Sequence, residues 1–265
     1  MIKFIATDLD GTLLNEKKEL PKDFDEVLNA LNEKGIQFAI SSGRQYDTIL
    51  KQFEKYGDQI TIIAENGAIV YEKGKRIILD PLDNDSAAEV LAAVKNEPGL
   101  YSLACGANGA MGEEENEEHI KNVLMYYVNY RTVDNVIEAS RHDDILKIAI
   151  YDDELSENHC YNVLKKFHNT HNVLVSGEHW LDVMKTGVTK GSAIEHIQKL
   201  RGYKPEECMA FGDFMNDADM MRVCFHSYAM ENAHPDLKAL CRFSAPSNDD
   251  SGVTKIIKKA VLNEI

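Results

Sequence analysis

The stretch that decides the fold is Asp8-Leu9-Asp10-Gly11-Thr12-Leu13, which directly follows a short and mostly apolar run, Ile2 to Thr7. Residues two apart in an extended chain point to the same side, so the carboxylates of Asp8 and Asp10 can face one crevice. Both lie just past the carboxyl end of a predicted strand, where open α/β sheets place their ligand sites. Gly11 permits the backbone turn that follows.

Two carboxylates this close repel each other and need a cation or a shared proton. Mg²⁺ takes oxygen ligands and keeps several waters, and with this ion holding Asp8 ionised, the free oxygen of Asp8 can attack phosphorus. Asp10, kept partly protonated, can act as general acid and then as general base. The sequence therefore indicates phosphoryl transfer at this strand end.

Three plainer interpretations of the pair compete with a catalytic one: a polar turn, a calcium loop and a helix cap. A calcium loop requires glycine where this chain has Leu13. The next predicted helix begins only near Pro21, too far away to be capped. The polar turn stays open for the dipeptide alone, whereas the whole six-residue string after a buried strand favours a functional site.

Predicted strands and helices alternate in the first and the last part of the chain. A helical pattern runs from Pro21 to Gly35, and apolar runs at 36–40 and 60–64 follow it. The same alternation returns from Lys190 to the last amphipathic helix. This order predicts an α/β fold with a parallel sheet and right-handed crossovers.

The middle of the chain has a different pattern. Residues 81–86 are typical of a linker and residues 185–187 of its return, with an α+β insert of about a hundred residues between them. The expected organisation is a core formed by 1–82 and 187–265 and a separate domain formed by 83–186. Within the insert, His179, Trp180 and Asp182 are candidates for substrate contacts, although a tryptophan in such a place more often packs in a core.

Composition limits the partners. The formal charge of −15, from 29 basic and 44 acidic residues, makes nucleic acid and anionic membrane surfaces poor partners. The same negative charge repels a phosphorylated substrate at long range, but salt screens this repulsion beyond ~8 Å. Attraction for such a substrate must therefore come from groups at the site itself. No apolar run approaches the ~18 residues of a membrane helix. Five scattered cysteines without a C-x-x-C pair argue against disulfides or structural zinc, so a cytoplasmic protein is expected.

A second group of candidate residues follows later strands. Asp213 and Asp217 come after the apolar run 208–211, and they converge on Asp8 if the first and fourth strands are neighbours. In isolation they would equally be turn or N-cap residues. Phosphate needs donors, and Ser42 and Gly43 end the second predicted strand where a helix begins. Lys190 adds a point charge, although alone it would more often be a surface lysine.

In this order, these elements resemble the haloacid dehalogenase superfamily of aspartate-nucleophile phosphatases, and the insert resembles the α/β cap of its Cof-type branch (class IIB). The resemblance rests on four motifs: Asp8-x-Asp10-Gly11-Thr12, Ser42-Gly43-Arg44, Lys190, and Gly212-Asp213-x-x-Asn216-Asp217. It implies a Rossmann-like core that carries the catalytic groups and an inserted α+β cap that selects the substrate.

The resemblance also implies a role for each matching residue. Asp8 would be the nucleophile and a Mg²⁺ ligand, and Asp10 the acid/base that binds Mg²⁺ through its carbonyl. Asp213 would be the remaining protein ligand, with Asp217 supporting it. The phosphate oxygens would be held by Leu9 (backbone N–H), Ser42, Gly43, Lys190 and Asn216. The expected function is hydrolysis of a small phosphorylated metabolite, with a phosphomutase or a non-catalytic metabolite sensor as alternatives.

Overall fold

The computed structural model describes residues 1–113 and 117–263, which form two compact units. The first consists of Met1–Ser42, Glu54–Ile77 and Thr189–Ile265, and the second of Gly43–Phe53 and Ile78–Val188. The sequence had placed residues 43–53 with the core, whereas contacts in the structure group them with the second unit. The division into a catalytic core and a substrate-selecting cap stays a prediction.

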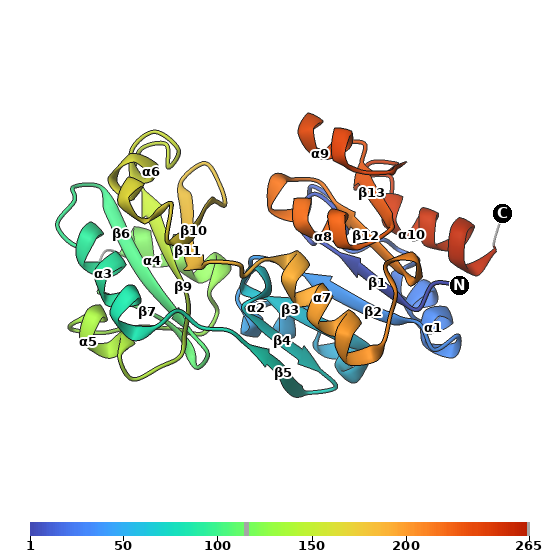
Figure 1. The fold of residues 1–265 in the computed structure, drawn as a ribbon, viewed down its shortest axis with the longest axis horizontal. Helices are drawn as coiled ribbons and strands as arrows, with labels where there is room; N and C mark the ends of the chain where they lie inside the picture. The colour runs from blue at the N-terminus through green and yellow to red at the C-terminus, as the bar shows by residue number, and fades with distance from the viewer. Residues whose placement is uncertain (114–116, 264–265) are drawn as a thin grey trace. The chain divides into compact units, whose positions relative to one another are not determined.

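A mostly parallel sheet forms the centre of the first unit (Figure 1). Its order is β14-β13-β12-β1-β2-β3-β4-β5, and β4 runs antiparallel to β3. The strands are β1 (Phe4–Thr7), β2 (Gln37–Ser41), β3 (Ile60–Ala64), β4 (Ile69–Glu72), β5 (Lys75–Leu79), β12 (Cys208–Gly212), β13 (His226–Met230) and β14 (Phe243–Ala245). Because β1 lies between β2 and β12 and parallel to both, the carboxyl ends of strands from both ends of the chain lie next to each other.

Helices connect these strands as the alternating pattern predicted. They are α1 (Phe24–Glu33), α7 (Lys190–Arg201), α8 (Ala218–Val223), α9 (Pro235–Leu240) and α10 (Gly252–Ile257). Helix α1 begins at Phe24, three residues after the proline that opens its sequence pattern, and buries Phe24, Val27, Leu28 and Leu31. The Phe24 ring lies edge-on to Phe38 at 5.7 Å and to Tyr56 at 5.2 Å, which fixes α1 over β2.

The second unit is an α+β structure around a six-stranded sheet of order β10-β11-β9-β6-β7-β8. Its strands are β6 (Leu100–Gly106), β7 (Gly109–Gly112), β8 (Tyr130–Thr132), β9 (Ile145–Asp152), β10 (His171–Val175) and β11 (Trp180–Lys185). Its helices are α2 (Tyr46–Gln52), α3 (Asn84–Val94), α4 (Glu117–Tyr126), α5 (Val136–Ser140) and α6 (Cys160–Val163).

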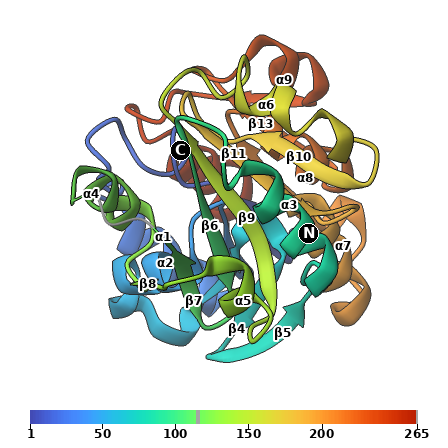
Figure 2. The same cartoon turned by 90° about the vertical axis from the view of Figure 1, so that its left-hand side faces the viewer.

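The two faces of this second sheet are covered differently. Helices α3 and α5 lie over one face (Figure 2), where Val90, Leu91 and Val136 join Ile148 and Ile150 in one buried cluster. Val123 of α4 and the following Tyr127 pack on the opposite face, against Leu103, Cys105 and Ala149. Alternation along each strand sends successive side chains to these two faces.

All five cysteines are free, as expected, and four of them are buried. In the described part of the chain, no helix combines the length and the apolar character that crossing a bilayer requires.

Candidate active site

Asp8 occupies the position directly after β1. Its backbone N–H donates to the Phe211 carbonyl at 3.0 Å, which joins the two strand ends of β1 and β12. The residue is only 6% exposed, and its Oδ1 accepts a hydrogen bond of 2.6 Å from Lys190 Nζ. A buried carboxylate needs such a partner, because an isolated charge out of water costs many kcal/mol.

Lys190 is the first residue of α7 and is completely buried. The preceding Thr189 caps the helix by accepting from Ser192 N, which sets the direction in which Lys190 leaves the helix end. Its ammonium donates to Asp8 Oδ1 and to Asp217 Oδ1, both at 2.6 Å. The lysine is thus a fixed charge between two carboxylates, and the alternative of a surface lysine is wrong.

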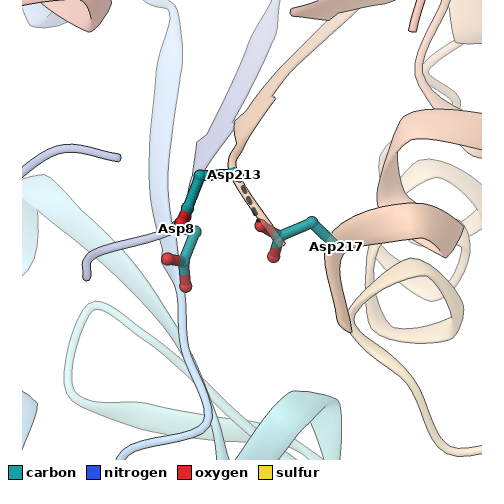
Figure 3. A group of neighbouring side chains, drawn as sticks. All are labelled: Asp8, Asp213 and Asp217. Carbon is teal, nitrogen blue, oxygen red and sulfur yellow. Dashed lines mark hydrogen bonds between the residues drawn. The ribbon is translucent and has the colours of Figure 1, made fainter. Parts of the chain in front are cut away.

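Asp213 and Asp217 complete the group on the loop after β12. Asp217 Oδ2 accepts from Asp213 N at 3.0 Å, the dashed line in Figure 3, and from Phe214 N at 3.3 Å. Asp213 Oδ1 accepts from the Thr12 hydroxyl at 2.7 Å. Both oxygens of Asp217 are engaged with protein, so this residue holds the loop and the lysine, whereas Asp213 projects toward Asp8 (Figure 3).

The carboxylates of Asp8, Asp213 and Asp217 each offer an oxygen within 4.8 Å of the others. Three carboxylates face one ammonium, which leaves an excess of negative charge in a buried place. Burial raises the pKa of Asp8 well above its usual value; Lys190 opposes this shift, and Asp217 and Asp213 add to it. Burial and the neighbouring Asp217 raise the pKa of Asp213 to about 6.

Lys190 responds in the opposite direction. Burial alone would lower its pKa, but the charges of Asp217 and Asp8 outweigh burial and raise the pKa above its usual range. The ammonium therefore stays charged at all physiological pH values. The remaining negative charge, presented entirely by oxygen atoms, fits a hard divalent cation such as Mg²⁺.

The Asp10 carboxylate does not join this group. Its Oδ1 forms an ion pair of 2.6 Å with Lys18, and the side chain is 37% exposed. The Asp10 backbone remains next to the site, because Gly11 follows it with φ +78° and a Cβ there would lie 2.4 Å from Asp213 Oδ2. If Asp10 is the acid/base, as the sequence predicts, its side chain must exchange Lys18 for substrate.

The other predicted phosphate-binding residues lie on different strand ends. Leu9 is fully buried beside Asp8, and Asn216 lies in the 3₁₀ turn Met215–Asp217 that carries Asp217. Ser42 follows β2, is 2% exposed, and donates its N–H to the Ile63 carbonyl at 2.9 Å. Gly43 belongs to the second unit, where its carbonyl oxygen accepts a hydrogen bond of 2.8 Å from Lys147 Nζ.

The sequence did not identify the Glu65–Gly67 turn as part of the site. Glu65, Asn66 and Gly67 all have positive φ values, of 49°, 52° and 105°, which for residues other than glycine is a strained conformation. Asn66 N donates to the Ser42 carbonyl at 3.0 Å, and a Cβ on Gly67 would lie 2.2 Å from the Thr189 carbonyl oxygen. The turn thus joins the Ser42 segment to the start of α7, and Asn-Gly after a strand was its one sequence signal.

A second contact that the sequence did not predict comes from Asn232. Its Nδ2 donates to the Gly11 carbonyl at 2.7 Å, and its Oδ1 accepts from Asn248 N at 3.2 Å. The tight turn after Asp10 is therefore held by the segment that follows β13.

Known proteins match nearly the whole chain. The family described as haloacid dehalogenase-like hydrolase matches residues 5–257. The 5-amino-6-(5-phospho-D-ribitylamino)uracil phosphatase of Escherichia coli (strain K12) is 32% identical, covering 99% of this chain and 97% of its own length. A crystal structure from Streptococcus mutans UA159 superposes with a TM-score of 0.88 at 26% identity, covering 99% of this chain and 100% of the other. The structure of a haloacid dehalogenase subclass IIB sugar phosphatase superposes with a TM-score of 0.83 at 24% identity. The match covers 97% of this chain and 98% of the other.

Proposed function

We propose, from the premise that this chain belongs to the haloacid dehalogenase-like hydrolases, that it is a Mg²⁺-dependent phosphatase which forms an aspartyl-phosphate on Asp8. One observation carries the proposal: a buried carboxylate is held 2.6 Å from a buried ammonium, with an excess of carboxylate oxygens around them. A structural ion pair would be balanced, whereas this group needs one more cation.

Asp8 would attack the phosphorus of a phosphate monoester through Oδ2, while its Oδ1 stays on Lys190. Lys190 would also bind a phosphate oxygen, together with the Leu9 N–H, Ser42, Gly43 and Asn216. Asp8, Asp213 and the Asp10 carbonyl would hold Mg²⁺, which supplies charge neutralisation for the phosphoryl group. Asp217 would keep Asp213 and Lys190 in place through the contacts that it makes with both.

Asp10 would give its proton to the departing alcohol oxygen and then take one from the water that hydrolyses the aspartyl-phosphate. In the structure its carboxylate is paired with Lys18, so substrate would displace Lys18 before Asp10 acts as an acid. Exchange of this exposed lysine contact is a small cost, since exposed ion pairs contribute about 0–1 kcal/mol.

The proposed substrate class is a phosphorylated sugar alcohol that carries a nitrogen heterocycle. Support comes from the 32% identical relative, whose name gives 5-amino-6-(5-phospho-D-ribitylamino)uracil as its substrate. A Bacillus subtilis (strain 168) relative at 25% identity carries the same substrate name. We propose that the second unit acts as the cap that selects this substrate, and that the enzyme works in the cytoplasm, where its free cysteines stay reduced.

The variant Asp8→Asn tests the proposal. It removes the nucleophile while keeping the size of the side chain, so we expect phosphate release from p-nitrophenyl phosphate with Mg²⁺ to fall about 10⁴-fold or more. Asp85→Asn, at an exposed aspartate of α3, is the matched control and should retain full activity. Circular dichroism checks that both variants fold, and near wild-type turnover in Asp8→Asn would show that the nucleophile is wrong.

The same assay separates the two alternative functions. Phosphate release without a bisphosphate activator favours a hydrolase, whereas a mutase would return the phosphoryl group to a sugar. A sensor would bind phosphorylated metabolites and release no phosphate from any of them, with or without Mg²⁺.

A further inference from the structure

Three aromatic side chains form a row across the second sheet. Tyr101 of β6 lies opposite Tyr151 of β9, and Tyr151 lies opposite Trp180 of β11 (Figure 2 shows β6 and β9 side by side). Side chains at paired positions of neighbouring strands share one face. The Tyr151 and Trp180 rings are 5.2 Å apart, and those of Tyr101 and Tyr151 6.4 Å, so the row is continuous.

His119 of α4 adds a fourth ring from the helix that covers this face. Its centroid lies 4.1 Å from that of Tyr101 and 5.9 Å from that of Tyr151. The carboxylate of Asp153, just after β9, contacts both Tyr101 and His119. It accepts a hydrogen bond of 3.3 Å from the Tyr101 hydroxyl and lies 3.7 Å from His119 Nε2. The carboxylate thereby fixes the orientation of two of the four rings.

The four rings line a cavity of about 230 Å³. Lys95 and Glu113 form an ion pair of 3.0 Å in another part of its wall, and Glu113 also accepts from Val136 N at 2.8 Å. Tyr101, Tyr151 and Trp180 are only partly buried, so the cavity is open to solvent and a ligand can reach their rings. The cavity lies below the ~300–1,000 Å³ of sites for complete drug-sized ligands, which suits a single ring system.

The chemistry of the walls selects the occupant. Aromatic rings stack on a planar ring, and a charged pair with both a donor and an acceptor can hydrogen-bond the N–H and C=O groups of a heterocycle. We propose that this cavity binds the planar nitrogen heterocycle of the substrate, an inference that rests on the proposed function for the identity of that substrate. It goes further by assigning ring recognition to Tyr101, His119, Tyr151 and Trp180.

Trp180 makes the inference directly testable, because it is the one tryptophan of the chain and its fluorescence reports on this cavity alone. The probes are the two halves of the proposed substrate: 5,6-diaminouracil, which has the ring, and D-ribitol 5-phosphate, which has the phosphate. We expect 5,6-diaminouracil to quench Trp180 saturably and D-ribitol 5-phosphate to leave its emission unchanged. Dihydrouracil, whose ring is puckered, should bind at least about tenfold more weakly.

Tyr151→Leu removes the middle ring of the row and should raise the dissociation constant of 5,6-diaminouracil about three- to tenfold. Tyr161→Leu is the matched control, since Tyr161 is an exposed aromatic of α6 whose ring contacts His168 instead. The inference is overturned if wild-type protein shows no saturable quenching, if dihydrouracil binds equally well, or if Tyr161→Leu weakens binding as much as Tyr151→Leu. The two ligand comparisons need only wild-type protein, so they hold even if Tyr151→Leu does not fold.

Failure of the inference and failure of the proposed function give different results. If 5,6-diaminouracil binds but no phosphorylated compound is hydrolysed, the ring site stands and the phosphatase proposal fails. If D-ribitol 5-phosphate is hydrolysed as efficiently as the complete substrate and 5,6-diaminouracil does not bind, the phosphatase stands and the ring site fails.

Discussion

Two buried lysines, one in each unit, have opposite surroundings. Lys190 in the first unit contacts two carboxylates and lies near a third, so negative charge is in excess. Lys147 of β9 in the second unit forms one ion pair with Asp182 at 3.2 Å. Its ammonium also donates to the Gly43 carbonyl at 2.8 Å and lies over the Tyr127 ring, 5.5 Å from the ring centroid.

From this difference we infer which of the two buried ion pairs serves chemistry. Around Lys147 the one carboxylate of Asp182 faces the one ammonium within the pair. Around Lys190 the charges of ammonium and carboxylates do not cancel, which raises the pKa values of Asp8 and Asp213 and favours binding of a further cation. The proposed active site thus rests on excess charge, rather than on burial alone.

Among the changes that test this comparison of the two lysines, the largest effect is expected for Lys190→Met. Loss of the ammonium removes the charge that would stabilise the phosphoryl group, so kcat/KM should fall about 10³-fold in a phosphate-release assay. Lys190→Arg keeps the charge but changes its shape in a fully buried place, and it should recover little of the activity. Activity of Lys190→Met within tenfold of wild type would contradict the distinction between the two lysines.

A smaller effect, on stability, is expected at the balanced pair. Lys147→Met leaves Asp182 buried without its ammonium and should lower the free energy of unfolding by about 3–5 kcal/mol, measured by urea titration. Adding Asp182→Leu removes the remaining charge and should restore most of that loss. A double variant no more stable than Lys147→Met would mean that the pair is not balanced as described.

The smallest effect concerns pH in protein freed of divalent ions with a chelator. Because folding raises the pKa of Asp213 from 3.8 to about 6, the folded state binds more protons than the unfolded state between these values. Stability should therefore fall as pH rises from 4 to 7, on the order of 2 kcal/mol from this group.

Asp213→Asn removes that titration and should flatten the pH profile of thermal unfolding. Mg²⁺ should raise the melting temperature of the wild type at pH 7.5 and have a much smaller effect on Asp213→Asn, since ligand binding stabilises only a folded state that holds the ligand. Equal shifts in both proteins would place the ion elsewhere.

The sequence predicted the features that depend on chain order and chemistry. Carboxylates after β1 and β12 converge because parallel strands end at one edge, and Asp8, Asp213 and Asp217 accordingly meet. The buried state of Lys190 needed the structure, since one lysine at a helix start gives no signal of burial. Likewise, the partner of the Asp10 carboxylate, Lys18, comes from a local turn that propensities do not specify.

The sequence revealed less about the second unit. Strand β6 contains Ala104 and Gly106, residue types that are depleted in strands, and it was not predicted. The aromatic row depends on the register of β6, β9 and β11, which is set by pairing between distant segments. Residues 43–53 group with this unit through contacts such as Gln45 with Asn129, and no local pattern encodes such contacts.

The position of β1 between β2 and β12 has a consequence for the growing chain on the ribosome. Asp8 is synthesised 182 residues before Lys190, which at about 5–20 residues per second is a delay of about 10–40 s. Throughout that interval β1 has one open hydrogen-bonding edge and Asp8 lacks its ammonium. Most of the second unit therefore emerges from the exit tunnel before the segment that completes the first sheet and pairs with Asp8, the proposed nucleophile.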